Sequence, residues 1–330
     1  RAPFESILSH GFVVDGKGMK MSKSSGNIIS PEEILKKYGA DILRLWVASS
    51  DYAEDLRIDH SILEQHAESY RKIRNTFRFI LGNLKDDFSP QDFKKIKYND
   101  FPELEKLILH KLFLLNIEIK NNLKSYNFHK LQKELLNFCA LDLSSFYFDI
   151  RKDILYCDDL NSKKRKSCVT LLNIILECLL KWYAPVLSFT TEEIIELAEK
   201  NKKKSIHEET FPEIPSNWKK ETLYKKWEKL LDIRQQVNVA IEEKRSSKVI
   251  GSSLEANVEI DLPKSDFDIL KGIDAEELFI TSHVKQNILK GTTNELTVAV
   301  KKANGTKCTR CWKIVEKVKD NKCSRCFKIK

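Results

Sequence analysis

No uninterrupted apolar run in this 330-residue sequence is long enough to cross a lipid bilayer, although 42% of the residues are hydrophobic. The sequence also lacks a secretory signal pattern and an initiator methionine, because it begins at Arg1. These absences argue against a membrane protein or a secreted protein, and the missing methionine indicates part of a longer chain. The length leaves room for two or three domains, each with its own core.

The spacing of a disulfide framework is also missing from half of the eight cysteines, which are scattered through helical sequence: Cys139, Cys157, Cys168 and Cys178. We interpret these four as buried reduced thiols of a cytoplasmic protein. The other four form two CxxC pairs near the C-terminus: Cys308 with Cys311, and Cys323 with Cys326. Two CxxC turns bring four thiolates to one ion and leave no coordination position open, which predicts one structural zinc ion. Disulfide bonds are the less favoured alternative.

Basic residues are in excess, with 57 Lys and Arg against 48 Asp and Glu and a net charge of +9. Runs of them occur at residues 163–166, 202–204 and 225–226. This balance favours a polyanionic partner such as nucleic acid, although a charged helix surface alone gives a similar composition.

A short lysine-rich stretch near the N-terminus consists of Lys20, Met21, Ser22, Lys23 and Ser24. Glycines on both sides allow this stretch to bend around a polyanion, and the two ammonium groups would neutralise it. A short buried strand is expected before it, over residues 10–15, and a helix after it, starting at the Ser-Pro-Glu-Glu sequence of residues 30–33. The stretch is therefore predicted to be a phosphate-binding loop, with an ordinary solvated surface loop as the alternative.

The middle of the chain has the periodicity of helices. Two short helices separated by Gly39 are expected over residues 31–58, followed by a long helix that begins after residue 59 and a polar turn region over 85–100. Further helical segments start at Phe101, Phe128 and Val169, and a fifth is expected to open with a capping box at Thr190 to Glu193. Together these segments predict a helical bundle.

A change of character follows the bundle. Residues 201–218 have the composition of an extended linker, and a helix is expected over 221–244. Residues 254–260 and 295–300 alternate as strands do, with a short helix after Ser265 between them. This part is predicted to be a small α+β module.

Residues 10–27, HGFVVDGKGMKMSKSSGN, together with residues 38–46, resemble the signature loop of class I aminoacyl-tRNA synthetases. Residues 141–156, 182–190 and 248–256 resemble the bacterial-type isoleucyl-tRNA synthetases within that class. The resemblance implies a multidomain, mainly α fold with four parts. These are the end of a Rossmann-type catalytic domain with its lysine loop (1–60), a helical anticodon-binding domain (61–218), an α+β junction module (219–302) and a zinc ribbon (303–330).

The resemblance implies that this is the C-terminal part of an enzyme that activates isoleucine with ATP, together with Mg²⁺, and transfers it to tRNA(Ile). In such enzymes the lysine loop binds ATP, so Lys20 and Lys23 are the implied catalytic residues, and Met21, Ser22 and Ser24 are implied to line the nucleotide site. Lys23 would stabilise the pyrophosphate leaving group. A monomer without membrane contact is expected. Arg310, Trp312, Lys313, Lys322 and Arg325 would surround the zinc ion and face RNA.

The sequence departs from the family pattern because it contains no His-x-Gly-His motif, amino-acid pocket or editing insertion. This piece by itself is therefore expected to be catalytically inactive. A valyl- or leucyl-tRNA synthetase is the alternative within the class, and the terminal cysteine pairs and residues 142–156 argue against it. A non-catalytic tRNA- or RNA-binding protein is the alternative from another class, and such a protein has no use for the lysine loop.

Overall fold

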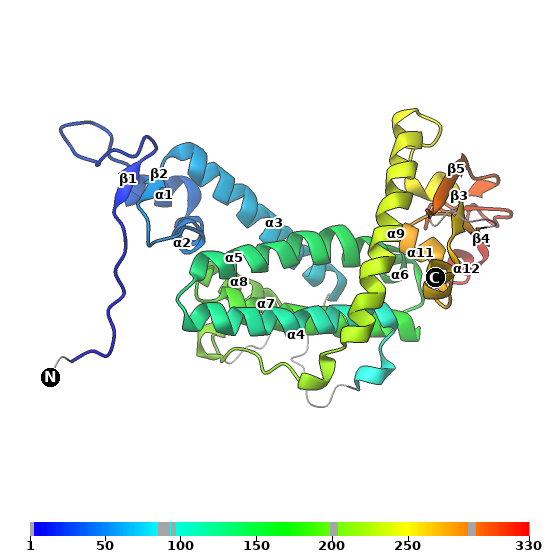
Figure 1. Ribbon diagram of the computed structural model, residues 1–330, viewed down its shortest axis with the longest axis horizontal. Coiled ribbons are helices and arrows are strands. Elements are labelled where there is room, and N and C mark those ends of the chain that lie inside the picture. The colour runs from blue at the N-terminus through cyan, green and yellow to red at the C-terminus, as the bar shows by residue number, and fades with distance from the viewer. Residues whose placement is uncertain (1–2, 85–92, 94–96, 199–203, 290–294, 330) are drawn as a thin grey trace. The chain divides into compact units, whose positions relative to one another are not determined.

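The computed structural model describes residues 3–84, 93, 97–198, 204–289 and 295–329 (Figure 1). The chain forms two compact units, which are described separately. The first unit contains residues 1–98, 111–145 and 169–218, and the second contains 99–110, 146–168 and 219–330. Within the described residues no helix combines the length and apolar character needed to cross a membrane.

The first unit begins with two short parallel strands, β1 (Val13–Asp15) and β2 (Leu56–Ile58), which lie side by side in Figure 1. Two helices connect them: α1 (Pro31–Tyr38) and α2 (Ala40–Ser49). A parallel pair needs such a crossover, and this one is built from the helix signals read in the sequence. Ser30 caps α1 by accepting a hydrogen bond from the Glu33 amide, and Gly39, at φ 83°, separates the two helices.

The predicted strand over residues 10–15 is shorter in the structure, and most of it is not buried. Only Val14 is buried, while Phe12 is 80% exposed. Strand β1 pairs with β2 alone among the described strands, and Val13 beside Val14 is exposed.

The helices of the first unit confirm the predicted helical segments. They are α3 (His60–Leu84), α5 (Phe128–Asn137) and α8 (Ser188–Ala198), with parts of α4 (Glu103–Lys124), α7 (Lys163–Tyr183) and a π-helix (Phe138–Tyr147). The apolar side chains of α3 follow a spacing of three or four residues and are buried at Leu63, Ile73, Phe77 and Ile80.

The predicted start of α8 is wrong. The helix begins at Ser188, so Thr190 and Thr191 lie inside its first turn and are buried. Thr191 Oγ1 donates to the Leu187 carbonyl instead of capping a helix end. The Thr-x-x-Glu pattern therefore does not form a capping box here.

The second unit contains a three-stranded sheet in the order β4-β3-β5, with β4 parallel and β5 antiparallel to β3. Its main elements are α6 (Phe148–Cys157), α9 (Glu221–Ser246), β3 (Ala256–Leu262), α10 (Lys264–Leu270), α11 (Ala275–Phe279), β4 (His283–Ile288) and β5 (Thr297–Lys302). Alternate residues of β3 are buried, as its sequence predicts. Strand β4 was not predicted, because its side chains are mostly half-buried and do not alternate clearly between apolar and polar.

The C-terminal part of the second unit consists of β6 (Thr306–Lys307), β7 (Ile314–Val315) and α12 (Ser324–Phe327). Single 3₁₀ turns occur at Tyr98–Asp100, Ile206–Glu208, Ser216–Trp218 and Ser253–Glu255. The predicted polar turn over 85–100 falls mostly outside the described residues, and the described part of the predicted linker, 204–218, contains two such turns and no other helix or strand.

Candidate functional site

The lysine loop follows directly from the end of strand β1. The chain reverses at Asp15, whose backbone accepts a hydrogen bond from the Gly18 amide at 2.9 Å and whose own amide donates to the Met19 carbonyl at 2.9 Å. Gly18 has a φ of 82°, a conformation that glycine adopts without strain. After the reversal Lys20 lies opposite Val14 in an antiparallel bridge, so the start of the loop is fixed against the strand.

Two polar side chains, Asp15 and Asn27, close the loop at its two ends. Asn27 Nδ2 donates to Asp15 Oδ2 at 2.8 Å and to the Lys20 carbonyl at 3.2 Å. Asn27 Oδ1 accepts from the Ser22 amide at 3.0 Å. The other carboxylate oxygen of Asp15 accepts from the Met19 amide at 2.8 Å. The hydrogen bond from Asn27, followed by that from Met19, holds the pKa of Asp15 below its ordinary value, so the carboxylate stays ionised.

The two loop lysines contribute none of the side-chain hydrogen bonds that hold the ends of the loop. Lys20 and Lys23 are exposed, and neither side chain forms an ion pair within the described part of the chain. Met21 between them is partly buried against the cluster of Ile34, Trp46, Leu56, Ile58 and Leu63. The loop is thus tied to the core at Met21 and Asn27 while its two cations remain free to meet a ligand.

The serines of the loop bond to one another. Ser22 Oγ lies 3.1 Å from Ser24 Oγ and 2.7 Å from Ser25 Oγ, and it accepts from the Ser25 amide at 3.2 Å. Gly26, at φ 64°, ends this turn. These short side chains make a tight turn that leaves the segment around Lys23 open to solvent.

Helix α2, which follows the loop, is joined to residues 185–190 by two of its side chains, Asp41 and Arg44. The sequence did not reveal this role. Asp41 is buried and accepts from the Thr190 amide at 2.7 Å and from Thr190 Oγ1 at 2.6 Å. Arg44 donates to the Pro185 carbonyl at 2.6 Å and to the Val186 carbonyl at 3.0 Å. Both partner segments had been singled out in the sequence, but only the fold brings them together.

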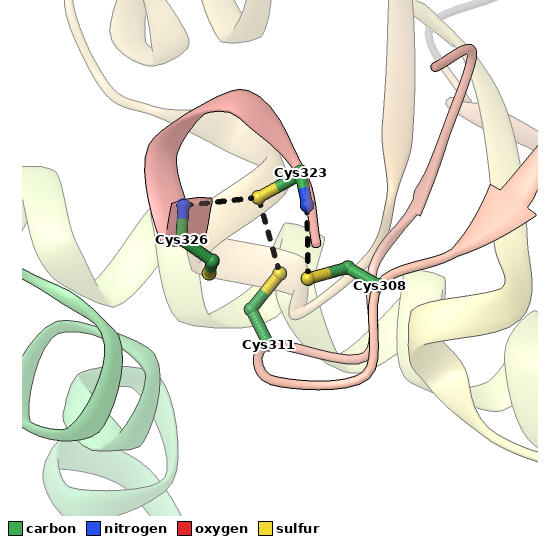
Figure 2. A group of neighbouring side chains, drawn as sticks. All are labelled: Cys308, Cys311, Cys323 and Cys326. Carbon is green, nitrogen blue, oxygen red and sulfur yellow. Dashed lines mark hydrogen bonds between the residues drawn. The ribbon is translucent and has the colours of Figure 1, made fainter. Parts of the chain in front are cut away.

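The four C-terminal cysteines, Cys308, Cys311, Cys323 and Cys326, form one buried cluster (Figure 2). Their sulfur atoms lie within 4.8 Å of one another, and all four are free thiols. The Cys323 amide points to Cys308 Sγ at 3.3 Å and the Cys326 amide to Cys323 Sγ at 3.4 Å. Four sulfur donors that converge in this way, with amides directed at the sulfurs, could hold a metal ion.

The thiols of this cluster titrate differently. Burial alone would raise the pKa of Cys308, but hydrogen bonds from the amides of Cys311, Cys323 and Arg310 outweigh it and lower that pKa to about 6. Burial raises the pKa of Cys326 to about 12. Metal binding would therefore release protons from these thiols, above all from those whose pKa is raised.

Arg310 and Arg325, for which RNA contact was predicted, both form hydrogen bonds inside the second unit, and the prediction of RNA contact stays a prediction. Arg325 donates to Asp153 through two nitrogens at 2.6 Å each, and Arg310 donates to the Tyr156 carbonyl at 3.2 Å. Trp312, by contrast, is 60% exposed.

Two parts of the chain match known protein families. Residues 1–59 match the family described as tRNA synthetases class I (I, L, M and V), and residues 105–260 match the family described as the anticodon-binding domain of tRNA ligase. The first match contains the lysine loop and the second contains most of the described helices. The chain belongs to the class I aminoacyl-tRNA synthetases.

Within that class, the chain is similar to curated isoleucine–tRNA ligases. The chain is 62% identical over 314 residues to the isoleucine–tRNA ligase of Pelagibacter ubique, an alignment that covers 95% of this chain and 34% of the relative. Those of Agrobacterium fabrum and Petrotoga mobilis are 42% and 43% identical over 323 residues each, and the alignments cover 95% of this chain and 33% and 35% of the relatives. The chain therefore spans about one third of the length of the curated relatives it matches.

A solved structure shares the fold. The LeuRS chain from a ternary complex of Agrobacterium radiobacter LeuRS with tRNA and LeuAMS aligns with a TM-score of 0.51 at 15% identity. The alignment covers 86% of this chain and 32% of that chain. At this identity the likeness concerns the fold alone.

Proposed function

We propose that this chain supplies the ATP-binding loop and the tRNA-binding parts of an isoleucine–tRNA ligase, which activates isoleucine with ATP and transfers it to tRNA(Ile). The observation that carries the proposal is the lysine loop, which is anchored at both ends and whose two lysines form no ion pair among the described residues, in a chain that is 62% identical to a curated isoleucine–tRNA ligase. We retain the predicted division into parts 1–60, 61–218, 219–302 and 303–330 as part of this proposal. A monomer that works in the cytoplasm completes it.

The lysine loop would act on the triphosphate of ATP. When the carboxylate of isoleucine attacks the α-phosphate, negative charge develops on the departing pyrophosphate, and a positioned ammonium group stabilises that charge. Lys23 has this role in the proposal and Lys20 supports it, while the backbone of Met21, Ser22 and Ser24 borders the nucleotide. Mg²⁺ would bind the phosphates together with the lysines.

The four-cysteine cluster would hold one structural zinc ion. The donor set fits, since four thiols converge and all four positions of a tetrahedral site are supplied by protein. The ion would cross-link the two CxxC turns and would take no part in the reaction.

The decisive experiment is ATP–pyrophosphate exchange by the complete gene product with isoleucine, valine and leucine as alternative substrates. Exchange that is fastest with isoleucine is the expected result. Preference for valine or leucine would favour the alternative within the class, and absence of exchange with all three would favour an RNA-binding role.

Binding of tRNA is tested separately with the 330-residue chain. Filter binding should show a preference for tRNA(Ile) over a tRNA with another anticodon, and the affinity should fall steeply as salt rises, because phosphate contacts release counterions. Equal affinity for both tRNAs would contradict anticodon recognition by these residues.

A further inference from the structure

The last turn of helix α6 contacts the four-cysteine module, which we define as residues 303–329. Arg325 Nη1 and Nη2 each lie 2.6 Å from an oxygen of Asp153, and Nη1 lies 3.3 Å from Asp158 Oδ1. A bidentate arginine–carboxylate pair of this kind fixes both distance and orientation. The pair is only partly exposed, with 36% of the Arg325 side chain and 27% of that of Asp153 accessible.

A second arginine of the module reaches the same turn. Arg310 Nη2 donates to the Tyr156 carbonyl at 3.2 Å, and Nη1 donates to the Ile329 carbonyl at 3.1 Å. Cys157, on the neighbouring position of α6, is buried against the four thiols, and its Sγ donates to the Arg310 carbonyl at 3.7 Å. Four consecutive or nearly consecutive positions of α6 and its C-cap thus contact the module.

The two arginines occupy equivalent places in the two CxxC turns. Arg310 directly precedes Cys311, and Arg325 directly precedes Cys326. The conformation of each turn therefore decides where its arginine points. An ion that fixes the four sulfur atoms would fix the starting points of both arginines as well.

The other end of α6 is held without the module. Arg151 donates to Glu105 at 2.6 and 2.7 Å and also pairs with Glu277, and the Arg151 and Glu105 side chains are buried. Near the last turn, one further contact comes from Arg165, which donates to the Leu155 carbonyl at 3.1 Å. Among the described residues, Arg151 in the first half of the helix thus has its partners outside the module, whereas most of the polar side-chain contacts of the last turn are with Arg310 and Arg325 of the module.

We propose that Arg325 and Arg310 are positioning residues through which the four-cysteine module holds the last turn of α6, so that metal binding in the module orders this turn. The consequence for RNA rests on the proposed function. Helix α6 lies within the residues that match the anticodon-binding family, so its ordering supports tRNA binding and not isoleucine activation.

Amide hydrogen exchange on the zinc-loaded chain tests the structural claim. Arg325→Gln keeps a polar side chain but removes the charge and the guanidinium group, and it should leave metal content unchanged while amide hydrogen exchange at residues 154–158 becomes about tenfold faster. Arg245→Gln is the matched control, because Arg245 pairs with Glu242 three residues away on the same helix, α9, and its side chain has no ion pair with another element among the described residues. Metal retention with wild-type exchange at 154–158 would overturn the proposal.

A double-mutant cycle identifies the pair. Asp153→Asn removes the partner from the α6 side, and the double variant Arg325→Gln/Asp153→Asn should exchange no faster than the more affected single variant. Additive effects of the two substitutions on the exchange rate would mean that the two residues act separately. This result would contradict the proposal that the Arg325–Asp153 pair holds the last turn of α6. Arg325→Lys serves as a milder variant, with an effect below that of Arg325→Gln because it keeps the charge and loses the bidentate geometry.

Metal removal and tRNA binding complete the test. Chelation should speed exchange at residues 154–158 as well as in the module, while residues 148–152 keep their protection. Fast exchange in the module alone would overturn the link to α6. Arg325→Gln should also weaken binding of tRNA(Ile) about tenfold. It should not change the rate of isoleucine-dependent ATP–pyrophosphate exchange by the complete gene product. If the wild-type chain binds no tRNA, the proposed function fails, whereas wild-type affinity in a variant with a loosened α6 overturns the inference.

Discussion

The lysine loop and the four-cysteine module both place basic residues in short turns, but the two regions use those charges in opposite ways. Lys20 and Lys23 are exposed and form no ion pair among the described residues, and the loop is held by the neutral amide of Asn27 and by Met21. Arg310 and Arg325 are bound to carbonyl and carboxylate oxygens of α6. A loop whose anchors are distinct from its cations keeps those cations available for a ligand.

The largest expected effect concerns the metal of the module. Residues 303–329 contribute few buried apolar side chains, so their fold should depend on one zinc ion, whose binding in such small sites is worth about 10–16 kcal/mol. We expect one equivalent of zinc per chain under reducing conditions, and its loss in Cys323→Ser. Metal analysis of the purified protein provides the measurement. Cys178→Ala, in a buried thiol outside the cluster, should retain the ion.

This prediction separates the two regions, because removal of the metal should leave the lysine loop unchanged. A zinc content below about half an equivalent, or full retention by Cys323→Ser, would mean that the four thiols do not form a closed tetrahedral site.

A smaller but still large effect is expected for a substitution of Lys23 in the lysine loop. In the complete gene product Lys23→Ala should slow isoleucine-dependent ATP–pyrophosphate exchange about a hundredfold or more, with little change in the KM for isoleucine, since the ammonium acts on charge that develops in the transition state. Lys17→Ala is the control, because Lys17 is an exposed lysine of the same turn whose backbone, not its side chain, bonds Asp15. Equal rates for Lys23→Ala and wild type would remove Lys23 from the site.

A moderate effect is expected for the loop anchor. Asn27→Ala removes the hydrogen bonds to Asp15, Lys20 and Ser22, so the backbone that carries the two lysines is no longer held in place. We expect the rate of ATP–pyrophosphate exchange to fall about tenfold. Ser25→Ala removes a hydroxyl within the exposed turn and should have little effect. If Asn27→Ala behaves like Ser25→Ala in the same assay, the anchor does not position the cations.

The smallest effect is expected for a structural cation of the first unit. Arg74 on α3 pairs with Glu193 on α8 through two contacts of 2.8 Å, but their side chains are 43% and 50% exposed. Arg74→Ala should therefore lower the free energy of unfolding by only about 0.5–1 kcal/mol in urea denaturation. Arg71→Ala, in a more exposed pair within one helix, should change it less. A loss above about 2 kcal/mol would show that cations in the first unit also hold the fold strongly.

The parts that were predicted correctly from the sequence depend on neighbours in the chain. Ser30, Pro31 and Gly39 mark the ends of α1 through local backbone chemistry, and the two CxxC turns bring their cysteines together by spacing. The start of α8 was predicted incorrectly because the local Thr-x-x-Glu pattern competes with Asp41, which is 149 residues away. The partner of Arg325 is 172 residues away and leaves no local signal at all.

The carboxylate of Asp41 also bears on the order in which the first unit folds. It accepts from the amides of Phe189 and Thr190, which belong to the first turn of α8 and have no partner within that helix. The side chain that caps the N-terminal end of α8 therefore comes from a distant segment of the chain. Closing so long a loop is slow compared with forming a helix. The first turn of α8 should become protected late in refolding, at the moment when α2 docks, whereas the centre of the helix can form earlier.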